Sequence, residues 1–273
     1  MIKKFLVGLM LVAGLSSSLL AHFQMIYTPE SALNKGAEIP LKLIFTHPFA
    51  DEHTMDMGLQ ADKSRAGIVD FYVIQKGKKT DLVKTLKEMK FQGSNNAGIG
   101  YETTYKARSL GDYVFVLTPA PYYEANEDAY IQQITKMVVN VAGAPSDWDS
   151  ELGLKAEIVP LTKPYSIWTG GTFSGIVKSN GKPVPFAEIE VEYLNHDIDV
   201  KNNKTNKKAN VKAPQDSFVT MGIKADANGK FTFGLPKSGW WGFAALGVGS
   251  DTEYKGKELS QDAVIWVQVK DMK

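Results

Sequence analysis

The residues whose types and spacing could carry chemistry are concentrated in one short stretch, Thr46–Gly58, which reads THPFADEHTMDMG. It holds two of the protein's four histidines, three carboxylates and two methionines: His47, His53, Asp51, Glu52, Asp56, Met55 and Met57. Imidazole nitrogens suit zinc, copper and nickel, thioethers suit softer ions, and carboxylates add negative charge. The stretch therefore predicts a metal site, in which Asp51 or Asp56 would orient the histidine rings.

An ordinary surface loop is the alternative interpretation of the same stretch. His47 and His53 are six residues apart, a spacing that matches no tight zinc signature, and acidic loops are common on protein surfaces. The choice between the two interpretations depends on a third histidine near the start of the chain.

The first 21 residues have the form of a secretory signal peptide. Lys3 and Lys4 make a basic start, Phe5–Leu15 is apolar, and Ala21 offers a small residue for cleavage. The apolar run is shorter than the roughly 20 residues that a membrane-spanning helix needs, and no later stretch approaches that length. Because there is no lipobox cysteine, the pattern predicts a bacterial periplasmic protein with no stable membrane span.

Cleavage after Ala21 would make His22 the first residue of the mature chain. An N-terminal histidine presents its α-amine and its ring Nδ1 together as a chelate. These groups ordinarily have pKa values of about 8 and about 6.5, so a metal displaces few protons at neutral pH. Cleavage after Ser18 is the alternative, and it would leave His22 as an ordinary internal residue.

The composition narrows the classes of partner. Lysine and arginine number 31 against 30 aspartates and glutamates, a net charge of +1 that argues against nucleic acid or an anionic membrane as the main partner. The absence of cysteine excludes disulfides, thiolate metal sites and cysteine nucleophiles. Any metal must therefore be held by nitrogen, oxygen and thioether donors.

Two strands are expected to position the histidines. Phe23–Tyr27 follows His22 directly, and Ile39–Phe45 ends just before His47. About 11 residues connect them, which is a normal length between neighbouring strands. If the two strands are antiparallel, the start of the first and the end of the second lie at one edge of a sheet. We therefore expect one cluster at that edge: His22, His47, His53 and either Met55 or Met57.

The rest of the chain consists of β-branched and aromatic runs bounded by turn residues, without a helical period. This pattern predicts an all-β protein of two tandem β-sandwich domains, immunoglobulin-like or transthyretin-like, at residues 22–143 and 165–273 with a linker at 144–164. The Lys- and Asn-rich stretch Asn195–Pro214 is interpreted as a mobile surface loop, and Trp240 and Trp241 as packing residues.

An acidic and aromatic loop, PYYEANED at 121–128, precedes a further strand. We interpret it as a solvated turn, because surface carboxylates are the rule. Glu124 is its candidate ligand if one of its carboxylates binds the metal.

Several segments carry a resemblance to a known family. They are AHFQMIYTP at 21–29, FTHPF and MDM within 45–57, PYYEANED at 121–128 and, in the second half, FSGIVKSNGKPVPFAEIEVEY and DANGKFTFGLPKSGWWGFAAL. Together they resemble the DUF-type family of exported proteins described as periplasmic components of cobalt/nickel ABC transport systems, over nearly the whole mature chain. The resemblance implies a nickel- or cobalt-associated periplasmic protein of two β domains. It carries over six candidate ligands: His22, His47, His53, Met55, Asp56 and Met57.

Three functional hypotheses follow from these observations. The leading one is a non-catalytic module that captures Ni²⁺, or alternatively Co²⁺, for a nickel/cobalt membrane transporter. The second is a histidine-brace oxidative enzyme, a class that also uses a terminal histidine amine and a second histidine. A copper-binding protein that uses the thioethers of Met55 and Met57 lies between these two. The third is a structural or adhesive tandem β protein in which the histidines are incidental.

Overall fold

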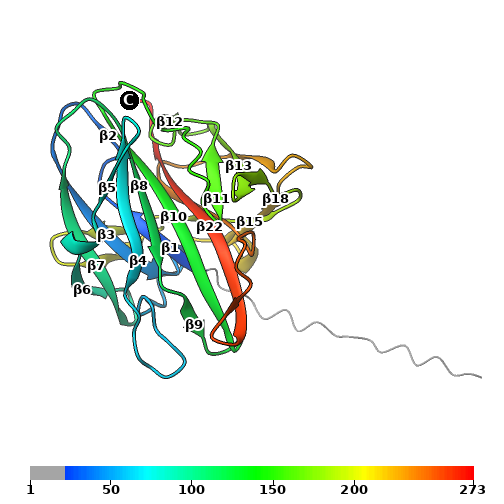
Figure 1. The fold of residues 1–273 in the computed structure, drawn as a ribbon. Coiled ribbons are helices and arrows are strands. Elements are labelled where there is room, and N and C mark those ends of the chain that lie inside the picture. The colour runs from blue at the N-terminus through cyan, green and yellow to red at the C-terminus, as the bar shows by residue number, and fades with distance from the viewer. Residues whose placement is uncertain (1–21) are drawn as a thin grey trace, which may run out of the picture.

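The computed structural model describes residues 22–273, and the signal peptide interpreted at residues 1–21 lies outside them. The described chain is built almost wholly from strands, arranged in three sheets (Figure 1). Its only helical turns are two short 3-10 helices, η1 (Val83–Thr85) and η2 (Asp216–Phe218). The all-β prediction is confirmed. Among residues 22–273, no helix has the length and apolar character that a membrane crossing needs.

The first sheet has six strands and begins with the strand that follows His22. In order they are β1 (Phe23–Tyr27), β3 (Glu38–Thr46), β7 (Ala97–Lys106), β6 (Lys87–Gln92), β17 (Lys204–Ala209) and β16 (His196–Asp199). The first four pair antiparallel with their neighbours. β17 and β16 come from the second half of the chain and extend this sheet.

The second sheet has twelve strands and draws on both halves of the chain. Its main path is β18 (Met221–Lys224), β15 (Glu188–Tyr193), β20 (Gly239–Ala245), β22 (Lys257–Lys270), β10 (Ala129–Val141), β8 (Gly111–Pro119), β4 (Ile68–Gln75) and β5 (Lys78–Asp81). Short strands attach to β10 and β22: β2 (Ala32–Leu33), β9 (Tyr122–Glu124), β12 (Ile167–Trp168) and β21 (Glu253–Tyr254).

The third sheet has four strands, β11 (Glu157–Pro160), β13 (Thr172–Ser179), β14 (Lys182–Pro183) and β19 (Lys230–Gly234). Its apolar side chains share one core with β15, β20 and β22, whereas the six-stranded sheet shares another core with β8 and β10. The molecule therefore contains two sandwiches, as expected for a tandem arrangement.

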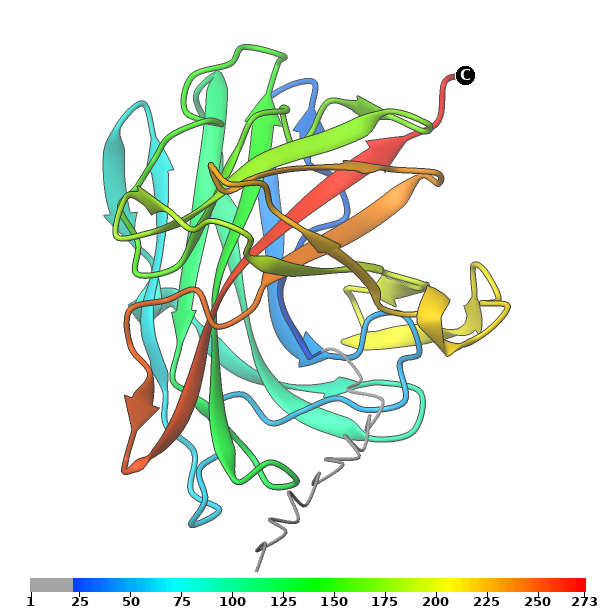
Figure 2. The ribbon, with the colours of Figure 1, turned by 90° about the vertical axis from the view of Figure 1, so that its right-hand side faces the viewer.

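The two sandwiches share the twelve-stranded sheet, which departs from the expected independent domains. β10 and β22 pair in parallel from Tyr130 opposite Leu259 to Met137 opposite Trp266, and Figure 2 shows the two strands side by side. Side chains alternate across β22, so Trp266 enters the first core and Ile265 the second. Residues 144–164, expected to be a linker, are instead part of the packed structure. They contain β11 and the buried carboxylates of Asp147 and Glu157.

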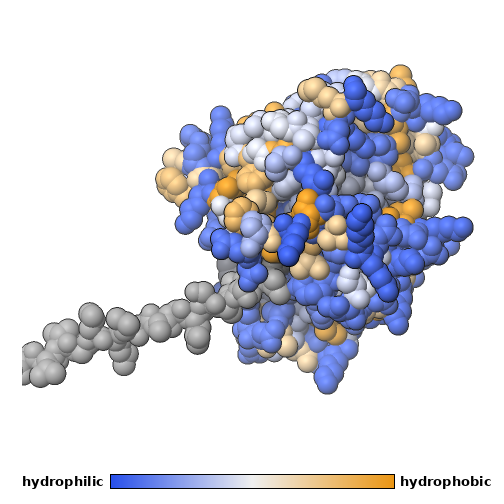
Figure 3. Space-filling view, turned by 180° about the vertical axis from the view of Figure 1, so that it is seen from behind, coloured by the Kyte–Doolittle hydropathy of each residue, from blue (hydrophilic) through white to orange (hydrophobic). Residues whose placement is uncertain are grey.

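The stretch expected to be a mobile loop, Asn195–Pro214, instead contains the hairpin of β16 and β17, shown in yellow in Figure 2. Two interactions attach this hairpin to the rest of the molecule: β17 pairs with β6 at Lys204, and Thr205 donates a hydrogen bond to Asp51. The packing role expected for Trp240 and Trp241 is confirmed, since both side chains are buried. Hydrophilic residues predominate on the face shown in Figure 3, and hydrophobic ones occur there in separate groups.

Candidate metal centre

The pairing of β1 with β3 brings the first two histidines together. Phe23 lies opposite Thr46 in this antiparallel pair, so His22 and His47 occupy the next positions at the same edge of the sheet. Their ring centroids are 4.8 Å apart, and the ring planes are nearly perpendicular at 87°. The expected meeting of His22 and His47 is confirmed, and it follows from strand register alone.

His53 lies beside the other two histidines because the chain folds back on itself after β3. The backbone N–H of His47 donates to the carbonyl of His53 at 3.2 Å, and that of Met55 donates to the carbonyl of Phe45 at 2.9 Å. These bonds place the His53 ring 6.0 Å from the His47 ring, measured between centroids. The three expected histidines therefore lie at one site.

Asp51 holds the turn between His47 and His53 in place. Its backbone is left-handed, with φ at 54°, and its N–H donates to the His47 carbonyl at 2.8 Å. Its buried carboxylate accepts hydrogen bonds from Ser94 and from the Thr205 hydroxyl. Asp51 therefore fixes the loop to β17 and to the turn after β6 and does not orient a histidine ring.

The ring nitrogens of the two central histidines differ in what they contact. The Nε2 atom of His22 lies 3.1 Å from a carboxylate oxygen of Glu124, and the Nδ1 atom of His47 is hydrogen-bonded to Glu52. When Nδ1 donates to a carboxylate, a neutral imidazole keeps its lone pair on Nε2. The Nε2 atom of His47 is buried and has no hydrogen-bond partner among residues 22–273. Since Nε2 makes the contact with Glu124, the Nδ1 atom of His22 is left for a ligand.

Burial, hydrogen bonds and neighbouring charges set the protonation states of Glu124, Glu52 and His53. The hydrogen bond with His22 lowers the pKa of Glu124 to about 2, although burial opposes this. Burial alone would raise the pKa of Glu52, but the hydrogen bond with His47 and a backbone hydrogen bond bring it below its usual value. Burial lowers the pKa of His53, and the rings of His47 and His22 lower it further. At neutral pH both carboxylates are therefore ionised and His53 is neutral.

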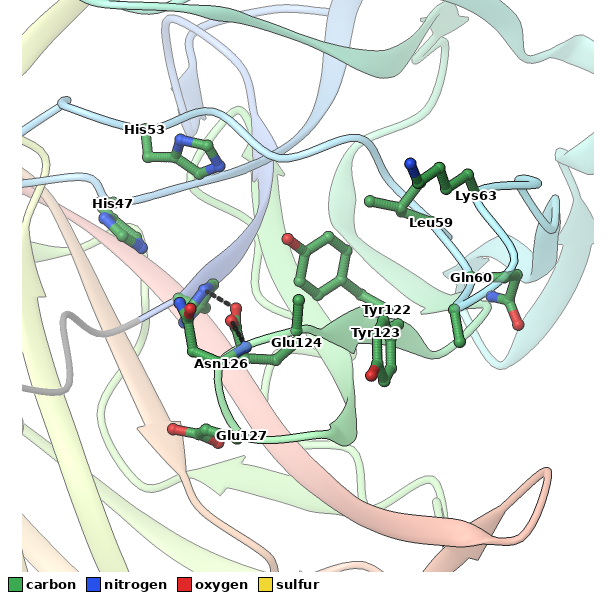
Figure 4. A pocket seen from close by; sticks show the side chains of 13 residues that line it. His47, His53, Leu59, Gln60, Lys63, Tyr122, Tyr123, Glu124, Asn126 and Glu127 are labelled. Atoms are coloured by element: carbon green, nitrogen blue, oxygen red, sulfur yellow. Dashed lines mark hydrogen bonds and ion pairs between the residues drawn. The ribbon is translucent and has the colours of Figure 1, made fainter.

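The histidines open onto a cavity of about 640 Å³. Figure 4 shows His47 and His53 on one side of it, Tyr122 and Glu124 from β9 below them, and the loop carrying Lys63 opposite. The aromatic rings of Phe45 and Tyr122 pack near His22, with centroids 5.7 and 6.1 Å from its ring. The site is thus a pocket with an aromatic wall, open on the side away from the core.

The other three candidate ligands do not line this cavity. Met55 and Met57 are buried in the first core, where the sulfur of Met57 lies 3.7 Å from the side-chain amide of Gln24. Asp56 accepts a hydrogen bond from the backbone of Ile99 at 2.7 Å. Their segment runs past β7, and burying an apolar side chain such as methionine contributes about 1.5–3 kcal/mol. The structure therefore uses both methionines for packing.

Three residues at the site were not assigned their observed roles from the sequence. Glu52, rather than Asp51 or Asp56, contacts His47. Glu124 contacts His22, although its loop was interpreted as a solvated turn. Gln133 on β10 donates to the His22 carbonyl at 2.7 Å. The signal available for Glu124 was its acidic and aromatic loop, whereas nothing local to Gln133 marks it.

The donor set fits a metal ion once the backbone nitrogen is counted. Within residues 22–273, no three His, Asp or Glu side chains form a ready metal-binding group. A chain that began at His22 would add its α-amine to the Nδ1 atom of that residue and the Nε2 atom of His47. The buried, unpartnered Nε2 atom is the observation that supports this fit, because such an atom costs about 1–3 kcal/mol unless something binds it.

Fold and site together define a class: an all-β protein of two sandwiches with a histidine pocket at the edge of one sheet. Sequence comparison then gives the family. Residues 19–249 match the family described as "Domain of unknown function (DUF4198)", and the chain belongs to that family. No curated protein matches the chain.

Solved structures show only distant similarity. The D0-D1 domain of intimin is 12% identical with a TM-score of 0.22, and the match covers 91% of this chain and 100% of that one. Dimeric latent PorU from Porphyromonas gingivalis is 9% identical with a TM-score of 0.24 over 94% of this chain, which spans 21% of that protein. Alpha-2-macroglobulin from Escherichia coli is 11% identical with a TM-score of 0.23 over 91% of this chain, which spans 16% of it.

Proposed function

We propose that the chain, cleaved before His22, is a periplasmic protein that binds a divalent metal ion and serves metal uptake. The ion is Ni²⁺, with Co²⁺ and Cu²⁺ as competitors. Its donors are the α-amine and Nδ1 of His22 and Nε2 of His47. The observation that carries the proposal is the buried, unpartnered Nε2 atom of His47 beside the His22 ring.

The carboxylates beside the rings support a metal rather than a proton as the occupant. Metal-binding histidines almost always donate their other ring N–H to a carboxylate, a carbonyl or water. Glu52 and Glu124 each contact the ring nitrogen that the metal would leave free. Imidazole and amine nitrogens suit nickel and copper, which take nitrogen ligands in square-planar or tetragonal sites.

His53 is placed to contribute a fourth nitrogen. A metal–nitrogen bond of about 2.0–2.1 Å allows two imidazoles on one ion to have centroids up to about 6 Å apart. The His22–His47 and His47–His53 separations, 4.8 and 6.0 Å, both meet this limit. His53 is exposed at the cavity, so it can approach an ion held by the other two residues.

Titration of the protein that begins at His22 tests the proposal. Calorimetry should show binding of Cu²⁺, Ni²⁺ and Co²⁺ with affinity falling in that order, the usual order for a site of nitrogen and oxygen donors. Adding a single glycine before His22 should weaken Ni²⁺ binding by about 100-fold or more, because the amine leaves the chelate. His47→Ala should do the same. His196→Gln is the control, since His196 does not line the cavity and bonds the backbone of Asn206.

Unchanged Ni²⁺ affinity in both the extended and the His47→Ala proteins would remove the metal hypothesis. The uptake role has its own test in cells that lack the chain. Their nickel accumulation should be lower, and it should be restored by the wild-type chain and not by His47→Ala.

A copper-dependent oxidative enzyme is the second candidate. One observation favours it: an N-terminal histidine and a second, nearly perpendicular histidine form the donor set of a copper brace. The buried positions of Met55 and Met57 do not favour a thioether copper carrier. Peroxide production by the Cu²⁺-loaded protein, driven by a reductant, would support the enzyme, whereas its absence leaves the binding protein.

A further inference from the structure

The cavity beside the three histidines is much larger than a metal ion. Its volume is about 640 Å³, whereas one water molecule occupies about 30 Å³ of liquid. The histidines line one side only, and the far side is formed by the loop at 59–63 and by β9 (Figure 4). Most of the space therefore lies beyond the nitrogen donors.

The nitrogen donors that the chain offers would leave positions open on a six-coordinate ion. His22 and His47 would supply three nitrogens, and His53 a fourth at most. Glu52 and Glu124 are already hydrogen-bonded to the outer ring nitrogens of two of these histidines. Because the histidines line the cavity, an ion held by them would have its open positions filled by water or by a small molecule from the cavity.

Two lysines stand at the end of the cavity formed by the loop at 59–63, which also carries the exposed carboxylate of Asp62. Lys63 lines the cavity, and no described residue forms an ion pair with this lysine; Figure 4 shows its side chain extending from the loop. Lys255 adds a second cation there, since its ammonium donates to Gln60 at 2.9 Å and Gln60 is a lining residue. Glu124 and Glu127 line the β9 side, whereas both lysines belong to the end opposite the histidines.

A phenol stands between the end with the two lysines and the histidines. Tyr122 lines the cavity, and its phenol O–H can donate a hydrogen bond. No hydrogen bond from this hydroxyl to another described residue occurs, and Figure 4 shows it directed toward His53. An ammonium and a free O–H donor together are the groups that recognise a carboxylate.

We propose that this cavity takes the metal ion together with a small organic chelator that carries carboxylates, such as an amino acid or a hydroxycarboxylate. Donors of the chelator fill the open coordination positions. A second carboxylate of the chelator lies between the Tyr122 hydroxyl and the Lys63 ammonium. This inference rests on the proposed metal site and names the chemical form in which the ion is captured.

Binding of bare and chelated nickel to the protein that begins at His22 tests the inference. The probes are Ni²⁺ alone and Ni²⁺ mixed with citrate, and the readouts are calorimetry and mass spectrometry under native conditions. We expect a ternary mass that contains protein, nickel and citrate. Lys63→Met should weaken binding of the nickel–citrate mixture by about tenfold, the size of one charge-assisted hydrogen bond. The same change should leave binding of Ni²⁺ alone unchanged.

Lys84→Met is the matched control, because Lys84 is an exposed lysine on η1 that does not line the cavity. Tyr122→Phe provides a second variant and should weaken the ternary complex without loss of the fold. A protein that binds Ni²⁺ and strips it from citrate overturns the inference and leaves the metal site standing. Equal nickel–citrate affinity in the wild type and both cavity variants also overturns it. Failure to bind Ni²⁺ in either form overturns the proposed function itself.

Discussion

Glu52 contacts the Nδ1 atom of His47, and Glu124 contacts the Nε2 atom of His22. If their function is to orient the rings, Glu52→Gln and Glu124→Gln should each weaken metal binding by about 10–100-fold, because the neutral amide holds the ring less firmly and makes it a poorer ligand. Calorimetric titration with Ni²⁺ at pH 7 measures the effect. Glu127→Gln is the control, since Glu127 lines the same cavity and is exposed. Affinities equal to that of the wild type in both variants would leave the carboxylates a purely structural role.

At the same scale, the sequence predicted which histidines meet but not which carboxylates hold them. The meeting of His22 and His47 follows from two strands and a connection of ordinary length. The choice between Asp51 and Glu52 depends on one backbone angle. Asp51 is left-handed, so its carboxylate bonds Ser94 and Thr205 while Glu52 bonds His47. No local pattern in the sequence indicates that angle.

At the scale of the elements, side chains supply hydrogen bonds to the backbone along the edge of β1 that faces away from β3. Among the strands of residues 22–273, β1 pairs only with β3. The Gln133 side chain accepts from Gln24 N–H at 2.6 Å and donates to the His22 carbonyl at 2.7 Å, and the Trp266 indole donates to the Gln24 carbonyl at 2.9 Å. β10 and β22 therefore fix the backbone of the residue whose amine would bind the metal.

Gln133→Leu should release this backbone. The change leaves a buried N–H of Gln24 and the carbonyl of His22 without partners, at a cost of about 1–3 kcal/mol in the free energy of unfolding. Ni²⁺ affinity should fall as well, because His22 is no longer held against His47. Urea unfolding and Ni²⁺ titration measure the two effects separately.

Gln132→Leu is the matched control for that experiment. Gln132 is also buried on β10, but it bonds Pro119 and Gln261 and makes no contact with His22. We expect it to lower stability by a similar amount and to leave Ni²⁺ affinity intact. Equal losses of Ni²⁺ affinity in the two variants would show that general destabilisation weakens the site, and not the loss of the hydrogen bond from Gln133 to the His22 carbonyl.

Glu192 on β15 links the loop Thr46–Gly58, which holds His47 and His53, to the second sandwich. Its carboxylate accepts from the Phe49 N–H at 3.2 Å and from the Thr220 hydroxyl. Burial raises its pKa to about 8, despite these hydrogen bonds. Between about pH 4.5 and 8 the folded chain therefore keeps a proton that the unfolded chain loses, so stability falls as the pH rises through this range.

Glu192→Gln should remove the part of that pH dependence that Glu192 supplies; Glu190 on the same strand, whose pKa burial raises to about 7, supplies another part. The amide keeps the size of the side chain and cannot ionise, so the variant should melt at a higher temperature than the wild type at pH 8 and above, and close to it at pH 5. Thermal unfolding across pH 5–9 measures the difference. Glu188→Gln, an exposed change on the same strand, is the control. A wild-type slope retained in Glu192→Gln would assign the pH dependence to another group.

For the molecule as a whole, the strand content and the two cores were predictable from the sequence, but the connection between them was not. Alternating apolar residues mark each strand and the turns that bound it. The parallel pairing of β10 with β22 joins segments more than a hundred residues apart. A continuously buried strand such as Ala263–Val269 shows no alternation, because both of its faces enter cores. For that reason the sequence suggested separable domains.

The shared strand predicts that neither half folds alone. A chain of residues 22–143 lacks β22, so it loses Trp266 from the first core and exposes the edge of β10. A chain of residues 165–273 lacks β11 and the pairing that β10 gives to β22. Burying a large side chain such as Trp266 contributes about 3–5 kcal/mol, which is a large part of the 5–15 kcal/mol that holds a typical domain folded.

Residues 22–273 should therefore unfold in one cooperative transition, whereas each half should show no transition and should aggregate through its open strand edge. Urea unfolding followed by tryptophan fluorescence and by far-ultraviolet circular dichroism checks this. Two separate transitions in the full chain, or a cooperative transition in either half, would show that the sandwiches are independent despite their common sheet.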